Sequence, residues 1–195
     1  SATPYLIPAI RALAPAVSIT LPGSKSIALR QLAMASLATG STCIRGIPPC
    51  DDTDAMLDCI RVLGAGVIIE PDTITVTGPI SFTTDVHLDA RMSGASTRLL
   101  IGIAALRSGT THIDGHESLR ARTNAPLLKV LANHGCQVES TNGHLPTTIR
   151  GPLQPPAELV IDGSLSSQYV TALLLCVPVC AASEVQNIRI VGDLV

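Results

Sequence analysis

One segment of the chain, residues 17–46, reads VSITLPGSKSIALRQLAMASLATGSTCIRG. It aligns without a gap with residues 86–115, VHLDARMSGASTRLLIGIAALRSGTTHIDG. The identical pairs are Val17/Val86, Ser24/Ser93, Ala35/Ala104, Leu37/Leu106, Gly40/Gly109, Thr42/Thr111, Ile44/Ile113 and Gly46/Gly115. Glycine recurs where a helix should end, and Thr-x-Ile-x-Gly recurs where a strand should run. The chain therefore contains an internal repeat.

Each copy predicts the order strand, helix, strand, helix and two final strands. In the first copy we expect a strand at 17–20, a helix over 26–39 and a second strand at 42–45. A second helix, capped by Asp51 and ended by Gly64, should follow, and then a hairpin made of strands 66–70 and 74–78. In the second copy, Asn142-Gly143 predicts the hairpin turn, because both residues tolerate positive φ. A third copy begins at 159–162 and reaches a strand at 188–191.

These patterns predict an α/β domain of repeated β-α-β-α-β-β units at about 16–80, 85–153 and 157–195, with residues 1–15 outside the repeat. The third unit is incomplete, and its apolar edges would be open to solvent or to unwanted pairing. We therefore expect the chain to be the N-terminal part of a longer protein, or one partner of a split one.

The composition argues against several classes of protein. Of the 195 residues, 46% are hydrophobic and 14% are charged, which is unlike a disordered chain. No apolar run reaches the roughly 18 to 20 residues that span a bilayer. A formal charge of −2, two lysines and three aromatic residues are unlike a nucleic-acid binder, so neither nucleic acid nor a membrane is an expected partner. The six cysteines lack a CxxC pair, so reduced core thiols in a cytosol-like compartment are favoured over disulfides or a metal cluster.

Three strand-to-helix turns occupy equivalent places in the three copies: Ser24-Lys25-Ser26, Ser93-Gly94-Ala95 and Ser166-Ser167-Gln168. Free N–H groups and the helix dipole at a helix N-terminus favour an anion, and serine can both cap the helix and donate to phosphate or carboxylate oxygens. Arg30 follows Ser26 by one helical turn, so both can face the same ligand as Lys25. Together the turns predict a polyanion site; the alternative is that each serine only caps its helix.

Other basic residues are less clearly assigned. Arg98 occupies nearly the place of Arg30 in the second copy, and Arg122 precedes the second helix of that copy, where it either faces a ligand or is a solvated charge. Arg107, Arg150 and Arg189 are expected on the surface.

Two competing motifs are disfavoured. The turn at Lys25 lacks the two glycines that a P-loop requires, because Ser24 and Ile19 occupy their positions. His112 and His116, even with Asp114 or Glu117 as a further ligand, lie across a predicted strand end and not on one helical face, so no metal site is expected.

A family resemblance runs in order along nearly the whole chain. The motifs that carry it are LPGSKSIALR (21–30), DDT (51–53), SGASTRLL (93–100), DGSLSSQY (162–169) and GDLV (192–195). In these motifs the sequence resembles the N-terminal part of EPSP synthase, the 3-phosphoshikimate 1-carboxyvinyltransferase, whose enolpyruvyl transferase fold has two domains of three β-α-β-α-β-β units each.

The resemblance implies transfer of the enolpyruvyl group of phosphoenolpyruvate to the 5-hydroxyl of shikimate 3-phosphate, with release of phosphate and without a metal or organic cofactor. It implies a place in the shikimate pathway of aromatic amino acid biosynthesis, in the cytoplasm, or in the plastid if the source is a plant. Holding two anionic substrates together requires many charge-assisted donors, which the three turns could supply.

The resemblance also implies roles for single residues. Lys25 resembles the lysine that touches both substrates and is the expected catalytic residue of this chain. Shikimate 3-phosphate would be bound by Lys25, Ser26, Arg30, Ser166, Ser167 and Gln168, with Arg30 placed to pair with the shikimate carboxylate. Phosphoenolpyruvate would be bound by Lys25, Gly94, Arg122 and Gln168, with Arg98 in a supporting role.

Two departures from the family pattern matter. The second turn reads Met92-Ser93-Gly94 where Asn-Ser-Gly or Asn-Ala-Gly is usual, so an amide that could brace this loop is missing, and Ala95 and Leu99 stand where Thr and Pro are frequent. We hypothesise that Met92 alters sensitivity to glyphosate, which competes for the phosphoenolpyruvate pocket. The family's acid/base carboxylates belong to a second domain that this chain lacks. We therefore expect half of a catalytic cleft, completed by that domain in cis or as a second chain, and no turnover by this chain alone.

Two other interpretations remain open. UDP-N-acetylglucosamine enolpyruvyl transferase shares the architecture, but it carries Asn after the lysine and a reactive Cys in a mobile loop, where this chain has Ser26 and no Cys in 115–122. The second is a non-catalytic anion-binding module that kept the fold.

Overall fold

The structure is a computed structural model that describes residues 18–19, 21–154, 156–180 and 187–193. Its helices are α1 (Lys25–Leu37), α2 (Asp51–Val62), α3 (Gly94–Ala104), α4 (Glu117–Arg120), α5 (Ala125–Asn133) and α6 (Ser167–Cys176), the last followed by the 3-10 helix η1 (Val177–Val179). Its strands are β1 (Gly40–Arg45), β2 (Gly66–Ile69), β3 (Thr73–Gly78), β4 (Val86–Asp89), β5 (Thr111–Asp114), β6 (Gln137–Thr141), β7 (His144–Arg150), β8 (Glu158–Asp162) and β9 (Asn187–Val191).

Within the described residues the strands form three separate sheets. The first has the order β1-β3-β2 and is antiparallel, the second has the order β4-β5-β7-β6, and the third pairs β8 with β9. The pairs β4–β5 and β8–β9 are both parallel, and each is joined through a helix that follows its first strand, α3 or α6. The same β-α-β path is therefore used in the second and the third sheet.

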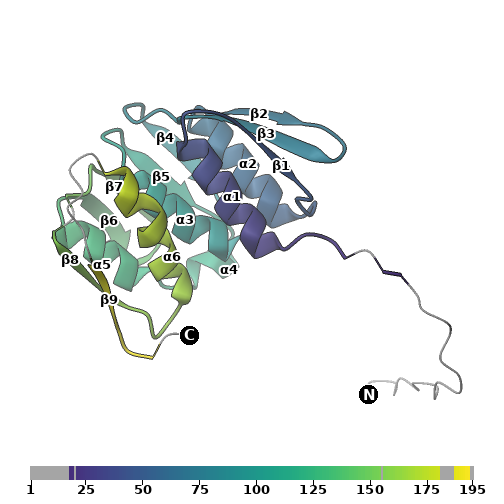
Figure 1. Ribbon diagram of the computed structural model, residues 1–195. Coiled ribbons are helices and arrows are strands. Elements are labelled where there is room, and N and C mark those ends of the chain that lie inside the picture. The colour runs from purple at the N-terminus through teal and green to yellow at the C-terminus, as the bar shows by residue number, and fades with distance from the viewer. Residues whose placement is uncertain (1–17, 20, 155, 181–186, 194–195) are drawn as a thin grey trace, which may run out of the picture.

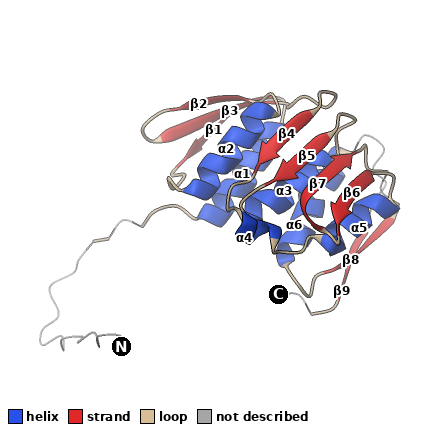
Figure 2. Ribbon diagram, turned by 180° about the vertical axis from the view of Figure 1, so that it is seen from behind, coloured by secondary structure: helices blue, strands red, loops and turns tan. Residues whose placement is uncertain are grey.

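Helices α1, α2, α3 and α6 lie against one another, with the strands on the outside (Figures 1 and 2). Helix α3 is central, since ten of its eleven residues are buried. A Cβ on Gly102 would lie 2.9 Å from the carbonyl oxygen of Ala172, so only glycine lets α3 pack this closely on α6. In α1, Leu29 and Leu32 are buried, whereas the apolar residues Ile27 and Met34 are exposed.

The predicted hairpins are confirmed. Strands β2 and β3 are joined across 70–72, and β6 and β7 are joined by Asn142 and Gly143, with φ of 53° and 77°. Positive φ at both turn residues gives the backbone the twist that an antiparallel pair needs. Gly64 and Gly135, with φ of 102° and 95°, follow α2 and α5, as the repeat predicts for residues that end helices.

Two local predictions are wrong. The first predicted strand is absent at Ser18 and Ile19, which are exposed and pair with no described strand; positions 17 and 20 lie outside the described residues. Cys50, and not Asp51, is the N-cap of α2. The Cys50 N–H donates to the Thr53 hydroxyl at 3.2 Å, which leaves the Asp51 carboxylate free to pair elsewhere.

The predicted surface position of Arg107 is also wrong, because this side chain is completely buried. Its Nε donates to the Ser81 carbonyl at 2.8 Å, and its two terminal nitrogens donate to the Thr84 carbonyl and the Thr111 hydroxyl. Burial lowers the pKa of Arg107, and the charge of Asp85 partly opposes that effect. Arg107 thus ties the chain after α3 to the loop between the first two sheets.

The other two arginines of that group, Arg150 and Arg189, are exposed as predicted. The prediction of core thiols is confirmed for Cys59, Cys136 and Cys176, which are buried and free. It is wrong for Cys43, which is exposed, and Cys50 and Cys180 are only partly buried. Across the described ranges, no helix has the length and the apolar character that crossing a membrane requires.

Candidate functional site

Each of the three turns begins a helix with a capping serine, as the sequence predicts. The hydroxyls of Ser24, Ser93 and Ser166 accept hydrogen bonds from backbone N–H groups one turn on, at 3.5, 3.2 and 3.2 Å. Ser26 and Ser167 follow as residues of the first turns of α1 and α6. The N-termini of α1, α3 and α6 are therefore stabilised locally, which leaves other donors of these turns available to a ligand.

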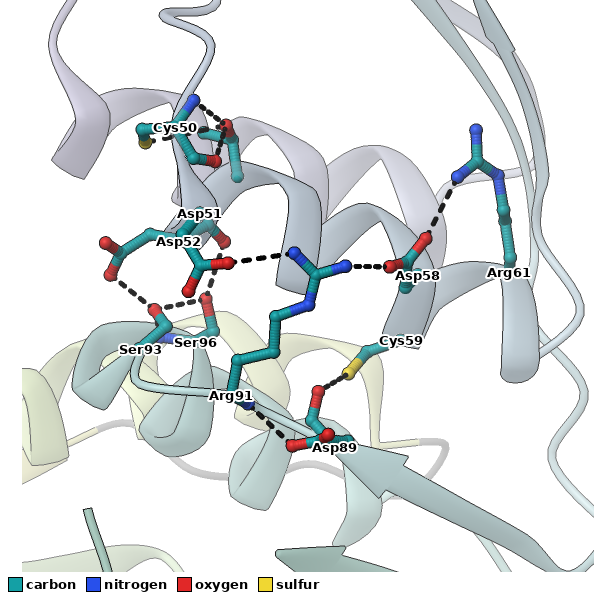
Figure 3. A network of polar contacts seen from close by, with 11 residues as sticks. Cys50, Asp51, Asp52, Asp58, Cys59, Arg61, Asp89, Arg91, Ser93 and Ser96 are labelled. Carbon is teal, nitrogen blue, oxygen red and sulfur yellow. Dashed lines mark hydrogen bonds and ion pairs between the residues drawn. The ribbon is translucent and has the colours of Figure 1, made fainter. Parts of the chain in front are cut away.

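The first two turns are joined by one carboxylate. The Lys25 ammonium lies 3.1 Å from Oδ2 of Asp52, and the Ser93 hydroxyl donates to Oδ1 of Asp52 at 2.6 Å (the serine contact is drawn in Figure 3). Burial raises the pKa of Asp52, but the hydrogen bonds from Ser93 and Lys25 and the charge of Lys25 outweigh it, so the net pKa lies below its ordinary value. Asp52 is therefore held as the carboxylate.

The first and third turns are joined by Arg30. Its guanidinium donates to the Ser26 carbonyl at 2.7 Å and to the Thr171 hydroxyl of α6 at 3.3 Å. That hydroxyl in turn donates to the Ser167 carbonyl at 3.2 Å. Hydrogen-bonded links thus run from Arg30 to the turns at the start of both α1 and α6.

The second turn lies beside two guanidinium groups. A Cβ on Gly94 would lie 2.5 Å from Nη1 of Arg98 and 3.1 Å from Nη1 of Arg122. Arg98 is only 6% exposed and donates to the Gly94 carbonyl at 2.7 Å, yet its Nε has no partner among the described residues. Burial lowers the pKa of Arg98, Tyr169 opposes this, and the neighbouring Arg122 adds to the lowering. Two cations this close to one another favour an anion between them.

Arg122 itself is exposed, and the loop that carries it is attached to α6. The Tyr169 hydroxyl donates to the Thr123 carbonyl at 2.8 Å. Tyr169 is buried and lies one residue after Gln168 of the third turn. The second and third turns are therefore linked through this loop.

The sequence did not single out Asp52 or the brace made by Ser93. Met92 is 59% exposed, and the next residue, Ser93, contacts Asp52. The motif 51–53 is visible in the sequence, but no spacing rule connects residues 52 and 93. Only the packing of α2 beside α3 brings them together.

A second region with polar side chains lies on the exposed face of β4, β5 and β7, around a hollow of about 840 Å³. His87 and His112 stack there with ring centres 4.4 Å apart. His112 contacts the Thr148 hydroxyl at 2.9 Å, and Asp114 accepts two hydrogen bonds from Arg120 at 2.8 and 2.7 Å. These groups are already paired, and in the part of the chain that the structure describes no three His, Cys, Asp or Glu side chains gather to hold a metal.

Comparisons with known proteins identify the family of the chain. The family profile of EPSP synthase (3-phosphoshikimate 1-carboxyvinyltransferase) matches residues 13–194. The 3-phosphoshikimate 1-carboxyvinyltransferase of Rhizobium etli strain CFN 42 is 39% identical over 176 residues, which cover 88% of this chain and 41% of the relative. That of Bordetella pertussis strain Tohama I is 36% identical over 184 residues, which cover 91% and 42%.

Solved structures give the same fold. EPSP synthase from Acinetobacter baumannii matches with a TM-score of 0.70 and 26% identity over 81% of this chain and 37% of that one. The enolpyruvyl transferase NikO from Streptomyces tendae matches with a TM-score of 0.58 and 18% identity, over 88% and 39%, and is a likeness of fold alone. The predicted enolpyruvyl transferase-like α/β fold is confirmed, and the chain spans about two fifths of the length of the curated relatives cited here. By sequence along most of its length, this chain belongs to the EPSP synthase family.

Proposed function

We propose that this chain supplies about half of the active-site cleft of a 3-phosphoshikimate 1-carboxyvinyltransferase. The reaction transfers the enolpyruvyl group of phosphoenolpyruvate to the 5-hydroxyl of shikimate 3-phosphate and releases phosphate. The observation that carries the proposal is the linkage of three capped helix N-termini through Asp52, Arg30 and Tyr169. Three helix N-termini joined in this way suit a ligand with several negative groups.

The shikimate 3-phosphate half of the site would use the first and third turns. Hydroxyl and amide donors of Ser26, Ser166, Ser167 and Gln168 suit a phosphate. Arg30 already lies between α1 and α6, so its guanidinium is within reach of a carboxylate on the same ligand. Lys25 adds a positive charge whose side chain is half exposed and therefore accessible.

The phosphoenolpyruvate half would use the second turn. Gly94 has no side chain to block an approach to the backbone, and Arg122 supplies a cation that is exposed to solvent. The Nε of the buried Arg98, which has no partner within the described ranges, supports an anion nearby, because an unsatisfied buried donor is costly. Lys25 and Gln168 would contact both substrates from the two neighbouring turns.

In this proposal the chain positions the substrates and neutralises their charge, which removes much of the entropic barrier to joining them. The acid/base carboxylates would come from the second domain, present in cis or as a second chain. The transfer needs neither a metal nor an organic cofactor. The protein would act in the shikimate pathway, in the cytoplasm or, in a plant, in the plastid.

Calorimetry with shikimate 3-phosphate tests the proposal. We expect binding to the chain, loss of at least about tenfold in affinity on Lys25→Ala, and no change on Lys129→Ala, the matched control on α5. Turnover should be seen only when the second domain is supplied. If shikimate 3-phosphate fails to bind even with that domain present, the chain is an anion-binding module without this activity.

A further inference from the structure

The carboxylate of Asp52 lies outside the three turns and contacts two of them, the first and the second. Asp52 lies in the first turn of α2, a helix to which the proposed function gives no ligand contact. Its two side-chain oxygens are divided between Lys25, at 3.1 Å, and the Ser93 hydroxyl, at 2.6 Å. Its backbone carbonyl also accepts a hydrogen bond from the Ser96 hydroxyl at 3.3 Å (Figure 3).

We propose that Asp52 is a positioning residue that fixes Lys25 and the Ser93-Gly94 turn relative to one another, so that they act as one unit. The identity of the ligands in this inference rests on the proposed function, whereas the link itself rests on the contacts alone. A change at either end of the link should therefore be felt at the other end, even without substrate.

The chemistry of the ammonium group makes this arrangement useful for binding. Lys25 has three N–H donors, and one contact with Asp52 leaves two for ligand oxygens. A lysine side chain has many rotamers, and ordering it only when the ligand arrives would cost affinity. Holding the ammonium beside the second turn in advance lowers that cost.

The second turn benefits in the same way. Ser93 is 1% exposed, and its hydroxyl has two close partners: Asp52, which accepts its hydrogen bond at 2.6 Å, and the Ser96 hydroxyl at 2.7 Å. Met92 offers no polar group to brace this loop. Asp52 is therefore the brace that ties the turn before Gly94 to α2, in addition to the hydrogen bonds that the turn makes with Ser96 and Ala90.

The neighbouring Asp51 provides a matched control. It lies in the same helical turn and carries the same charge, but its carboxylate pairs with Arg91 at 2.9 Å and makes no contact with Lys25. Removing either charge changes the helix dipole interaction equally. Of these two aspartates, only Asp52 should release Lys25 when it is replaced.

The test uses the fact that the chain has two lysines, Lys25 and Lys129. In the ¹⁵N-labelled chain, NMR relaxation of the side-chain ammonium groups should show Lys25 to be less mobile than Lys129. Asp52→Asn should raise the mobility of Lys25 to that of Lys129, and Asp51→Asn should leave it unchanged. Ser93→Ala should raise the mobility of Lys25 in the wild-type background and have no further effect in Asp52→Asn.

A second measurement covers the case in which Asp52→Asn does not fold. Lys25→Met changes a half-exposed side chain, and we expect it to shift the backbone amide signal of Gly94 through Asp52. Equal mobility of the two lysines in the unmodified chain would overturn the proposal. So would an unmoved Gly94 signal, or release of Lys25 by Asp51→Asn.

The effect on binding separates this inference from the proposed function. If shikimate 3-phosphate binds, Asp52→Asn should weaken it by up to about tenfold, the cost of ordering one long side chain. Tighter binding would show that Asp52 competes with the ligand for Lys25 and would overturn the positioning role. If no variant binds the ligand while the mobility results hold, the proposed function fails and the link stands.

Discussion

Replacing Arg107 by methionine should destabilise the chain strongly. The change removes four hydrogen bonds from a buried charged group. Three are close, to the Ser81 carbonyl, the Thr84 carbonyl and the Thr111 hydroxyl, and the fourth is longer, to the Thr84 hydroxyl at 3.4 Å. A hydrogen bond to a charged group contributes about 1.5 to 3 kcal/mol, so the gross loss is at least about 4.5 kcal/mol. Part of this is offset because methionine carries no charge to desolvate, a cost that is visible in the lowered pKa of Arg107. We expect a net loss of about 2 to 4 kcal/mol in the free energy of unfolding.

Urea unfolding followed by circular dichroism measures this loss, and Arg150→Met is the matched control. Arg150 is exposed and makes one hydrogen bond, to the Ser108 carbonyl at 2.9 Å, so its loss should cost less than about 0.5 kcal/mol. The dependence of the free energy on urea should be the same in both variants if only stability changes. If the two variants differ by less than about 0.5 kcal/mol, the buried guanidinium does not hold the loop after β3 and the reasoning is refuted.

Three further predictions concern the second turn, the thiols and acid stability. Gly94→Ala places a Cβ 2.5 Å from a nitrogen of Arg98 and 3.1 Å from a nitrogen of Arg122. In the two-domain protein the KM for phosphoenolpyruvate should therefore rise about tenfold or more, and an unchanged KM would argue against a phosphoenolpyruvate pocket at this turn. A thiol reagent at pH 8 should label the exposed Cys43 at least about tenfold faster than Cys59, because burial raises the pKa of the Cys59 thiol to about 12. Peptide mass spectrometry measures both labelling rates, and equal rates would contradict this prediction. Hydrogen bonds from Arg120 lower the pKa of Asp114 in the folded chain. The ionised Asp114 therefore stabilises the fold fully above the pKa of an unfolded aspartate, about 3.9, and this stabilisation is lost as the pH falls through the lower pKa of the folded state. Asp114→Asn should therefore reduce the free energy of unfolding at pH 6 and not at pH 2, and an equal reduction at both would exclude this linkage.

Features that depend on neighbouring residues were predictable from the sequence. The capping serines follow from the preference of a short polar side chain for a helix N-terminus. The turn at Asn142-Gly143 follows from the positive φ that both residues tolerate. The repeat extended these local rules from one unit to the next, because equivalent residues meet the same backbone geometry.

Features that depend on distant partners were not predictable. Arg107 is buried with neutral carbonyl and hydroxyl groups as its partners, and no acidic residue in the sequence marks it as internal. The Asp52 contact with Ser93 joins residues 41 positions apart, through the packing of α2 on α3. Ser18 and Ile19, the described part of the predicted strand at 17–20, pair with no described strand, because an alternating pattern alone does not supply a partner.

The binding of shikimate 3-phosphate to the first and third turns can be observed directly by titrating it into the ¹⁵N-labelled chain, whose mass is 20.2 kDa. We predict that the backbone amide signals of Ser26, Ser167 and Gln168 move together along one saturable curve, while those around Lys129 stay in place. If the signals that move lie instead around His87 and His112, or if the two turns follow separate curves, then the turns do not form a common site for shikimate 3-phosphate.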